Sequence, residues 1–157
     1  MKLIDIYRNA VKKGISKDPR TASEIKKELD NEKKEYRKLK GPDARAFDKE
    51  RFTNPYADTR ILYGDPQGDV KTIMVGVDME SPEILTADRL NERGYSIDLV
   101  MAHHPEGAAW ANFYDVMKIQ TAMFSKFGIP KEVGEAMLNE RMGEVARAVA
   151  GLPQVNA

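Results

Sequence analysis

Hydrophobic positions recur at helical spacing over the first part of the chain. Apolar side chains three or four positions apart over residues 3–11 predict a short amphipathic helix that ends at Gly14. A second helix is expected to begin at Thr21, because Thr21 and Glu24 have the spacing of a reciprocal capping box, and to continue to about Lys40. Both segments are dense in acids and bases, so the pattern predicts solvated helices with a narrow apolar seam.

The pattern changes after these helices. Residues 41–59 contain turn-forming residues without a clear period, so we interpret residues 1–59 as a charged helical extension with a linker. Residues 60–157 are then expected to form an α/β domain. Within it, two β-rich runs at 60–64 and 71–79 flank a turn that contains proline and glycine, which indicates an antiparallel hairpin. The second run is the stronger strand prediction.

A strand, a helix and a second strand are predicted next. After the run at 71–79, Ser81 provides an N-cap, Pro82 suits the first helical position, and Gly94 ends the helix. The apolar run at 96–102 is typical of a strand covered on both faces. The predicted fold class is therefore α/β, with a βαβ-containing sheet flanked by helices and preceded by the charged helical N-terminal extension.

Two further helices are expected to flank this sheet. Residues 112–127 place apolar side chains around one face, which predicts a buried helix that ends at Gly128. Residues 130–150 repeat the helical pattern, with Gly151 as the expected end.

The composition narrows the function classes. The 157 residues include 25 basic and 25 acidic side chains, so no net field attracts nucleic acid or an anionic membrane. A local basic patch in the helix at 26–40 leaves nucleic-acid binding as a weaker alternative. No apolar run spans a bilayer and the N-terminus does not resemble a secretory signal, so we expect a cytoplasmic protein. The absence of cysteine restricts a metal site to His, Asp, Glu or backbone oxygen.

Candidate metal-binding and catalytic side chains lie where the two predicted strands end. His103 and His104, the two histidines of the chain, follow the second strand, and Asp78 follows the first. The carboxyl ends of parallel strands form the edge at which α/β sheets bind ligands, and neutral imidazole is a common metal ligand. Since neighbouring strand residues point to opposite sides, this arrangement favours two ions, one for each histidine. In the alternative, one ring bonds a backbone carbonyl and the other faces solvent.

The motifs "IMVGVDMESPEIL" and "SIDLVMAHHPEG" resemble the N-terminal part of the NGG-interacting factor three-like family, whose members are often labelled GTP cyclohydrolase I type 2 homologues. The resemblance covers residues 71–107 well and extends more loosely to Gly151. It implies an α/β fold with a dinuclear metal centre, in proteins that assemble as homo-oligomeric rings, often hexamers. The implied cofactors are divalent metal ions, with zinc, iron and manganese all compatible.

The resemblance implies roles for individual residues of this chain. The resemblance implies that His103 and His104 bind metal. It places Asp78 beside the pocket, where the carboxylate would orient a histidine or a metal-bound water. Asp78 is equally suited to capping the helix that begins at Ser81.

An acidic ligand is expected downstream, and Glu140 lies near the implied distance. Glu135 and Glu144 are rival candidates, and surface ion pairs are the alternative role for all three. The family's remaining ligands, a histidine and a glutamate, lie in its C-terminal part, whereas no histidine follows His104 here. We therefore expect the chain to be the N-terminal portion of a longer protein, with a reduced family member as the alternative.

These observations lead to two hypotheses from different classes. In the first, the chain binds two metal ions and is a metal-dependent hydrolase that acts on a phosphorylated or nucleotide-like small molecule. In the second, it is a non-catalytic, ring-forming regulatory or interaction module in which the metal is structural. No residue identifies itself as a general base from sequence.

Overall fold

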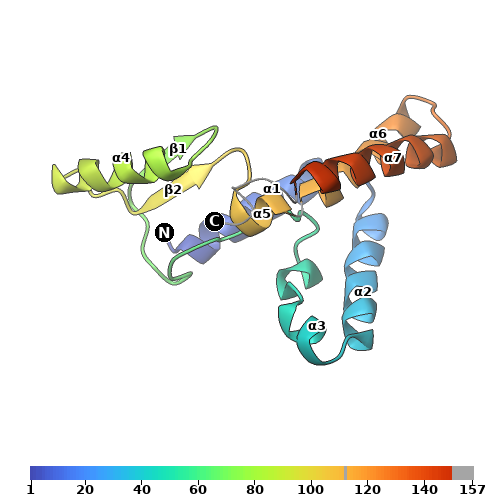
Figure 1. Ribbon diagram of the computed structural model, residues 1–157, viewed down its shortest axis with the longest axis horizontal. Helices are drawn as coiled ribbons and strands as arrows, with labels where there is room; N and C mark the ends of the chain where they lie inside the picture. Colours follow the sequence, from blue (N-terminus) through green and yellow to red (C-terminus); the bar gives the residue numbers. More distant parts are fainter. Residues whose placement is uncertain (112, 150–157) are drawn as a thin grey trace.

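The computed structural model describes residues 1–111 and 113–149 of a mixed helical and β-stranded protein (Figure 1), which confirms the broad α/β class. Its elements, in chain order, are α1 (Leu3–Lys17), α2 (Ala22–Lys38), α3 (Gly41–Ala46), the 3₁₀ helix η1 (Lys49–Phe52), β1 (Ile73–Gly76), α4 (Ser81–Glu92), β2 (Leu99–Ala102), α5 (Gly107–Ala111), the 3₁₀ helix η2 (Phe113–Lys118), α6 (Ile119–Lys126) and α7 (Lys131–Val149).

The elements form an open arrangement. In Figure 1, β1, β2 and α4 lie at one end, α6 and α7 lie at the other, α1 lies between them, and α2 and α3 project to one side. The accessible surface is 10819 Å², whereas a compact monomer of this mass exposes about 8,000 Å². Among the residues whose burial is described, few apolar side chains are buried: Val11, Ile25, Tyr56, Ala57, Val70, Met79, Ala87, Ala109 and Leu138.

Helix α1 continues past Gly14 to Lys17, so the predicted helix end was wrong. The glycine has a packing role instead, because a Cβ atom at this position would lie 2.8 Å from Cε2 of Tyr56. The Tyr56 ring lies beside Gly14. Its hydroxyl donates a hydrogen bond to the carboxylate of Asp18, the C-cap residue, at 2.9 Å. Close approach of an aromatic ring, rather than a turn, accounts for this glycine.

The capping box at the start of α2 is confirmed, with Thr21 and Glu24 bonding each other's backbone N–H groups. The segment after α2, predicted as an irregular linker, contains α3 and η1. These short helices return the chain to α2, where the rings of Tyr36, Phe47 and Phe52 pack with centroids 5.2 to 5.6 Å apart. This small aromatic cluster stabilises helices too short to persist alone.

The sheet contains two parallel strands, with Ile73 opposite Leu99 and Gly76 opposite Ala102. Helix α4 lies between them in sequence and ends before Gly94, which has φ +91° as a C-terminal glycine requires. Its N-cap is Glu80, one position before the predicted Ser81, and Glu80 and Glu83 form a reciprocal capping box. A carboxylate at this end of a helix also interacts favourably with the helix dipole.

The predicted antiparallel hairpin was wrong. Residues 60–64 form no strand, and they run beside α1. Backbone bonds from Leu3 to Gly68 and from Ile4 to Pro66 attach the following turn to the first residues of α1. The apolar residues Ile61 and Leu62 therefore line a groove beside α1 and have no partner strand within the described residues.

The single buried helix predicted for residues 112–127 was also wrong. The described part of this segment forms η2 and α6, and Phe127 is 78 % exposed. Gly128 ends α6 as predicted, with φ +83°. The predicted helix end at Gly151 lies outside the described residues.

Replacing Gly14 with alanine is expected to lower the free energy of unfolding by about 1–3 kcal/mol, because the added methyl group overpacks against Tyr56. Gly143→Ala is the matched control, since its Cβ would meet only the end of the Arg147 side chain at 3.5 Å. There the helix propensity of alanine is expected to raise stability by about 0.5–1 kcal/mol. Urea unfolding of both variants checks the prediction, and stabilisation by Gly14→Ala would contradict it.

Candidate metal centre

The pairing of the two strands continues beyond the sheet into the histidines. The backbone N–H of His103 donates to the carbonyl of Gly76 at 2.9 Å, and that of His104 donates to the carbonyl of Val77 at 2.8 Å. These bonds hold the residues after β2 beside those after β1. The two segments that sequence analysis singled out are therefore adjacent at the carboxyl-terminal edge of the sheet.

Asp78 contacts His104 directly. The Nδ1 atom of His104 lies 2.7 Å from Oδ1 of Asp78, and both side chains are about half exposed. An ionised carboxylate only accepts hydrogen bonds, so Nδ1 carries the proton and donates it. In this tautomer the lone pair of the imidazole is on Nε2. A carboxylate that orients a metal-binding histidine in this way is a common feature of metal sites.

The two imidazole rings lie on the same side of the chain. Their centroids are 5.1 Å apart and their planes are inclined by 33°. The expectation that the side chains point in opposite directions was wrong, because His103 and His104 follow the last residue of β2 and lie in a bend. Strand alternation therefore no longer supplies a geometric reason for one ion per histidine.

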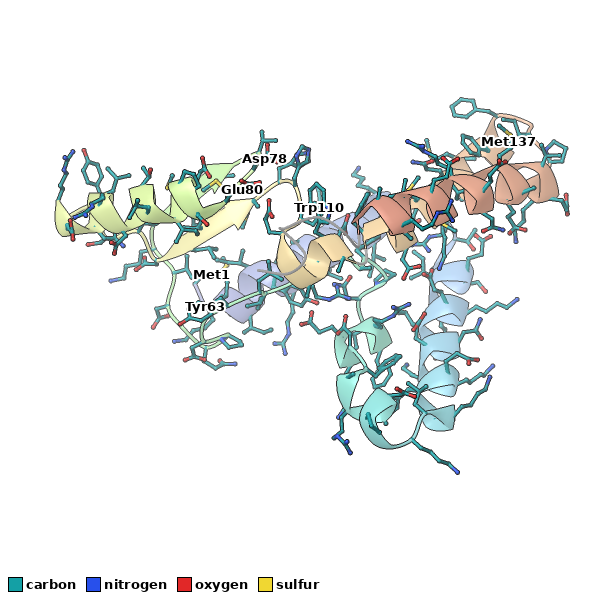
Figure 2. The ribbon with its side chains drawn as sticks, in the orientation of Figure 1. Met1, Tyr63, Asp78, Glu80, Trp110 and Met137 are labelled. Atoms are coloured by element: carbon teal, nitrogen blue, oxygen red, sulfur yellow. The ribbon has the colours of Figure 1, made fainter. Side chains whose placement is uncertain are left out.

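Two acidic residues that sequence reasoning missed lie near this pair. Burial, followed by the charges of Glu80 and Asp78, raises the pKa of Glu106, and His104 opposes this shift. Figure 2 shows Asp78 and Glu80 together where β1 gives way to α4. Their positions in the loops after the two strands were the available signal, since Glu80 lies between β1 and α4 and Glu106 directly follows the "HHP" motif.

The turn between β1 and α4 is fixed by packing. Met79 is buried, and its side chain fills the space that a Cβ atom on Gly76 would need. Because Met79 points inward, Asp78 is left on the outside of the turn, where it bonds His104. The alternative role of Asp78 as a helix cap is excluded, since Glu80 is the N-cap of α4.

Glu140, the implied acidic ligand, lies on the exposed surface of α7. No described interaction joins it to the histidines, and Figure 2 shows Met137, also on α7, far from Asp78. Both rivals form surface ion pairs, Glu135 with Lys131 and Glu144 with Arg141. The assignment of Glu140 as a ligand stays a prediction.

The donor types at this edge fit a divalent metal ion, since imidazole nitrogen and carboxylate oxygen bind zinc, iron and manganese. Their number is small. Within residues 1–111 and 113–149, no group of three His, Asp or Glu side chains is placed to hold one ion. The described residues therefore offer the imidazole nitrogens of His103 and His104 and nearby carboxylates, which are fewer donors than a complete coordination shell needs.

Comparison of the chain with protein-family models, with curated proteins and with solved structures finds no match. The helices in the described ranges also lack the length and apolar character needed to cross a membrane.

The tautomer of His104 tests the orienting role of Asp78. Above the range in which imidazole titrates, we expect nitrogen-15 NMR to show the Nδ1–H tautomer at His104, because the Asp78 carboxylate accepts this proton. Asp78→Asn should shift the population toward Nε2–H, the form favoured by free imidazole. His103 serves as the control within the same spectra. An Nε2–H tautomer of His104 in the wild-type protein would show that the bond does not form.

Proposed function

We propose that the chain is a divalent-metal-binding α/β domain with a role in metal-dependent hydrolysis of a phosphorylated or nucleotide-like small molecule. His103 and His104 provide nitrogen ligands, and Asp78 orients His104. Further ligands come from water, from the substrate, or from donors such as the one implied at Glu140. The proposal also takes β1, α4 and β2 as a right-handed βαβ unit, the arrangement that places the site at a ligand-binding sheet edge.

A single observation carries this proposal: the His104–Asp78 hydrogen bond of 2.7 Å at the carboxyl ends of two parallel strands. A surface ion pair could form anywhere on the protein. This one lies just past the ends of the strands, beside a second imidazole and near the carboxylates of Glu80 and Glu106. A cluster of titratable groups in which one carboxyl has a raised pKa, as Glu106 has here, is typical of functional sites.

The described side chains have separable roles in this proposal. A divalent ion bound here would acidify a water and polarise a phosphoryl or carbonyl oxygen. The Asp78 carboxylate stabilises the Nδ1–H tautomer of His104 and keeps Nε2 available. Glu106 is the candidate proton carrier, because its raised pKa brings it closer to neutral pH than an ordinary glutamate.

Metal content tests the proposal most simply. After incubation with zinc, manganese or iron, elemental analysis should find near-stoichiometric metal in the wild-type protein and little in a His103→Ala, His104→Ala double variant. Asp78→Asn should lower metal affinity by about 10- to 100-fold, the usual effect of losing a carboxylate behind a histidine ligand. Asp88→Asn, an exposed acid on α4, is the matched control.

Circular dichroism of each variant verifies that the fold is retained. Equal metal content in the wild-type protein and the folded double variant would overturn the proposed site. If the metal-loaded protein hydrolyses no phosphoester or nucleotide, the proposed metal site stands and the proposed hydrolase activity is rejected.

A specific observation favours the second function, a homo-oligomeric interaction module. Ile73 and Val75 on β1, and Val77 directly after it, are exposed, with Val75 66 % exposed and Val77 55 % exposed. Parallel sheets are normally covered on both faces, and exposed apolar patches mark interaction sites. In this proposal a second copy of the chain covers the face, which also reduces the large accessible surface.

Light scattering coupled to size-exclusion chromatography tests the assembly. The wild-type protein should elute as an oligomer, and Ile73→Lys with Val75→Lys should shift it to the monomer mass, because two charges would be buried in the contact. Ile84→Lys with Leu85→Lys makes the same change at exposed apolar positions on α4. A monomeric wild-type protein would contradict the second function and leave the metal site unaffected.

A further inference from the structure

A groove distinct from the metal centre lies along α1. Its volume is about 920 Å³, within the range of small-molecule sites. One wall is a single face of α1, whose lining side chains fall at helical spacing: Ile4, Tyr7, Arg8, Val11, Lys12 and Ile15. The opposite wall comprises residues from η1, the turn after it and the segment at 61–66.

The groove walls are fixed by hydrogen bonds. Asn54, only 2 % exposed, donates to the carbonyl of Thr59 at 2.8 Å and so fixes the start of the 61–66 segment. At its other end, the carbonyl of Pro66 accepts from the backbone of Ile4 at 2.8 Å. The intervening residues Ile61 and Leu62 line the groove, and Figure 2 shows Tyr63 near the first residues of the chain. A wall attached at both ends gives a preformed site, which lowers the entropic cost of binding.

The polar groups at the base of the groove already have partners. Tyr7 donates its hydroxyl hydrogen to Glu50 and accepts from Asn54 at 2.9 Å. Burial, followed by the hydrogen bond to Glu50, raises the pKa of Tyr7 to about 12, so the phenol is neutral at physiological pH. Glu50 also lies 3.9 Å from the Arg60 guanidinium. The Glu50 carboxylate therefore already has a hydrogen bond from Tyr7 and a nearby positive charge on Arg60. It does not pair with the cations on α1.

Those cations lack acidic partners. Arg8 and Lys12 are exposed, lie one helical turn apart on the groove face, and form no ion pair within the described part of the chain. Lys49, the third basic residue of the lining, lies over the Tyr36 ring. The chain as a whole has no net charge, whereas the groove combines an apolar wall with two exposed cations that have no ion-pair partner among the described residues.

We propose that this groove binds a small amphipathic anion, with an apolar body against Val11, Ile61 and Leu62 and a carboxylate or phosphate head on Arg8 and Lys12. The apolar lining favours a ligand with an apolar body over a purely ionic one, and the two neighbouring cations favour a charged head over a neutral one. This function is independent of the metal centre, since the groove contains none of the residues at the sheet edge.

Isothermal titration calorimetry with decanoate, decyl phosphate and neutral decanol tests the proposal. At least one of the two anions should bind at least tenfold more tightly than decanol, and the tighter anion identifies the head group. Arg8→Gln with Lys12→Gln should weaken its binding about tenfold and leave decanol binding unchanged. Lys13→Gln with Lys17→Gln removes the same charge from the same helix outside the groove and should have no effect.

A second pair of variants tests the apolar body. Leu62→Asn should weaken binding of the anions and of decanol, whereas Leu85→Asn on α4, which is similarly exposed, should not. Three results would overturn the proposal: no binding of either anion, equal affinity for the anions and decanol, or equal losses in the groove and control charge variants. Circular dichroism verifies that all variants retain the fold.

Discussion

The parallel pairing of β1 with β2 is the constraint on which the candidate metal centre depends. Four residues of each strand are in register, and the pattern continues through the bonds from His103 to Gly76 and from His104 to Val77. Without this continuation, Asp78 and His104 would be separated by 26 positions of chain and a helix. With it, their side chains meet at 2.7 Å. A short ladder thus converts two distant motifs into one site.

The rest of the molecule surrounds this unit loosely. Burial is distributed over small contacts, such as Tyr56 on Gly14 and the aromatic cluster beside α2, rather than one large core. This arrangement leaves both an exposed strand face and a groove along α1. The two surfaces differ in character, since the strand face is apolar and the groove adds the exposed cations Arg8 and Lys12. They therefore suit different ligands.

Local signals in the sequence predicted much of this structure. The capping box at Thr21, the end of α4 at Gly94 and the end of α6 at Gly128 depend on residues close in sequence, and the structure confirms them. Asp78 and the histidines were identified from their positions after apolar runs. Their contact followed from the expected parallel sheet.

The incorrect predictions share a physical cause: at these positions, contacts between residues distant in sequence determined the local structure. In the sequence, Gly14 suggests the end of a helix. In the structure, the glycine lies inside α1 and leaves space for the Tyr56 ring. Residues 60–64 have a strand-like composition, yet within the described chain they form no strand, and residues 61–64 line the groove beside α1. The relative orientation of the two histidine rings depends on a bend that sequence alternation does not encode.

A crystal structure of the protein grown with zinc, with an anomalous difference map at the zinc edge, tests the central claim most directly. The account predicts a peak about 2.0–2.1 Å from Nε2 of His104, with Asp78 still bonded to Nδ1. A peak absent from this edge of the sheet, or zinc bound at Nδ1 with Asp78 displaced, would contradict it.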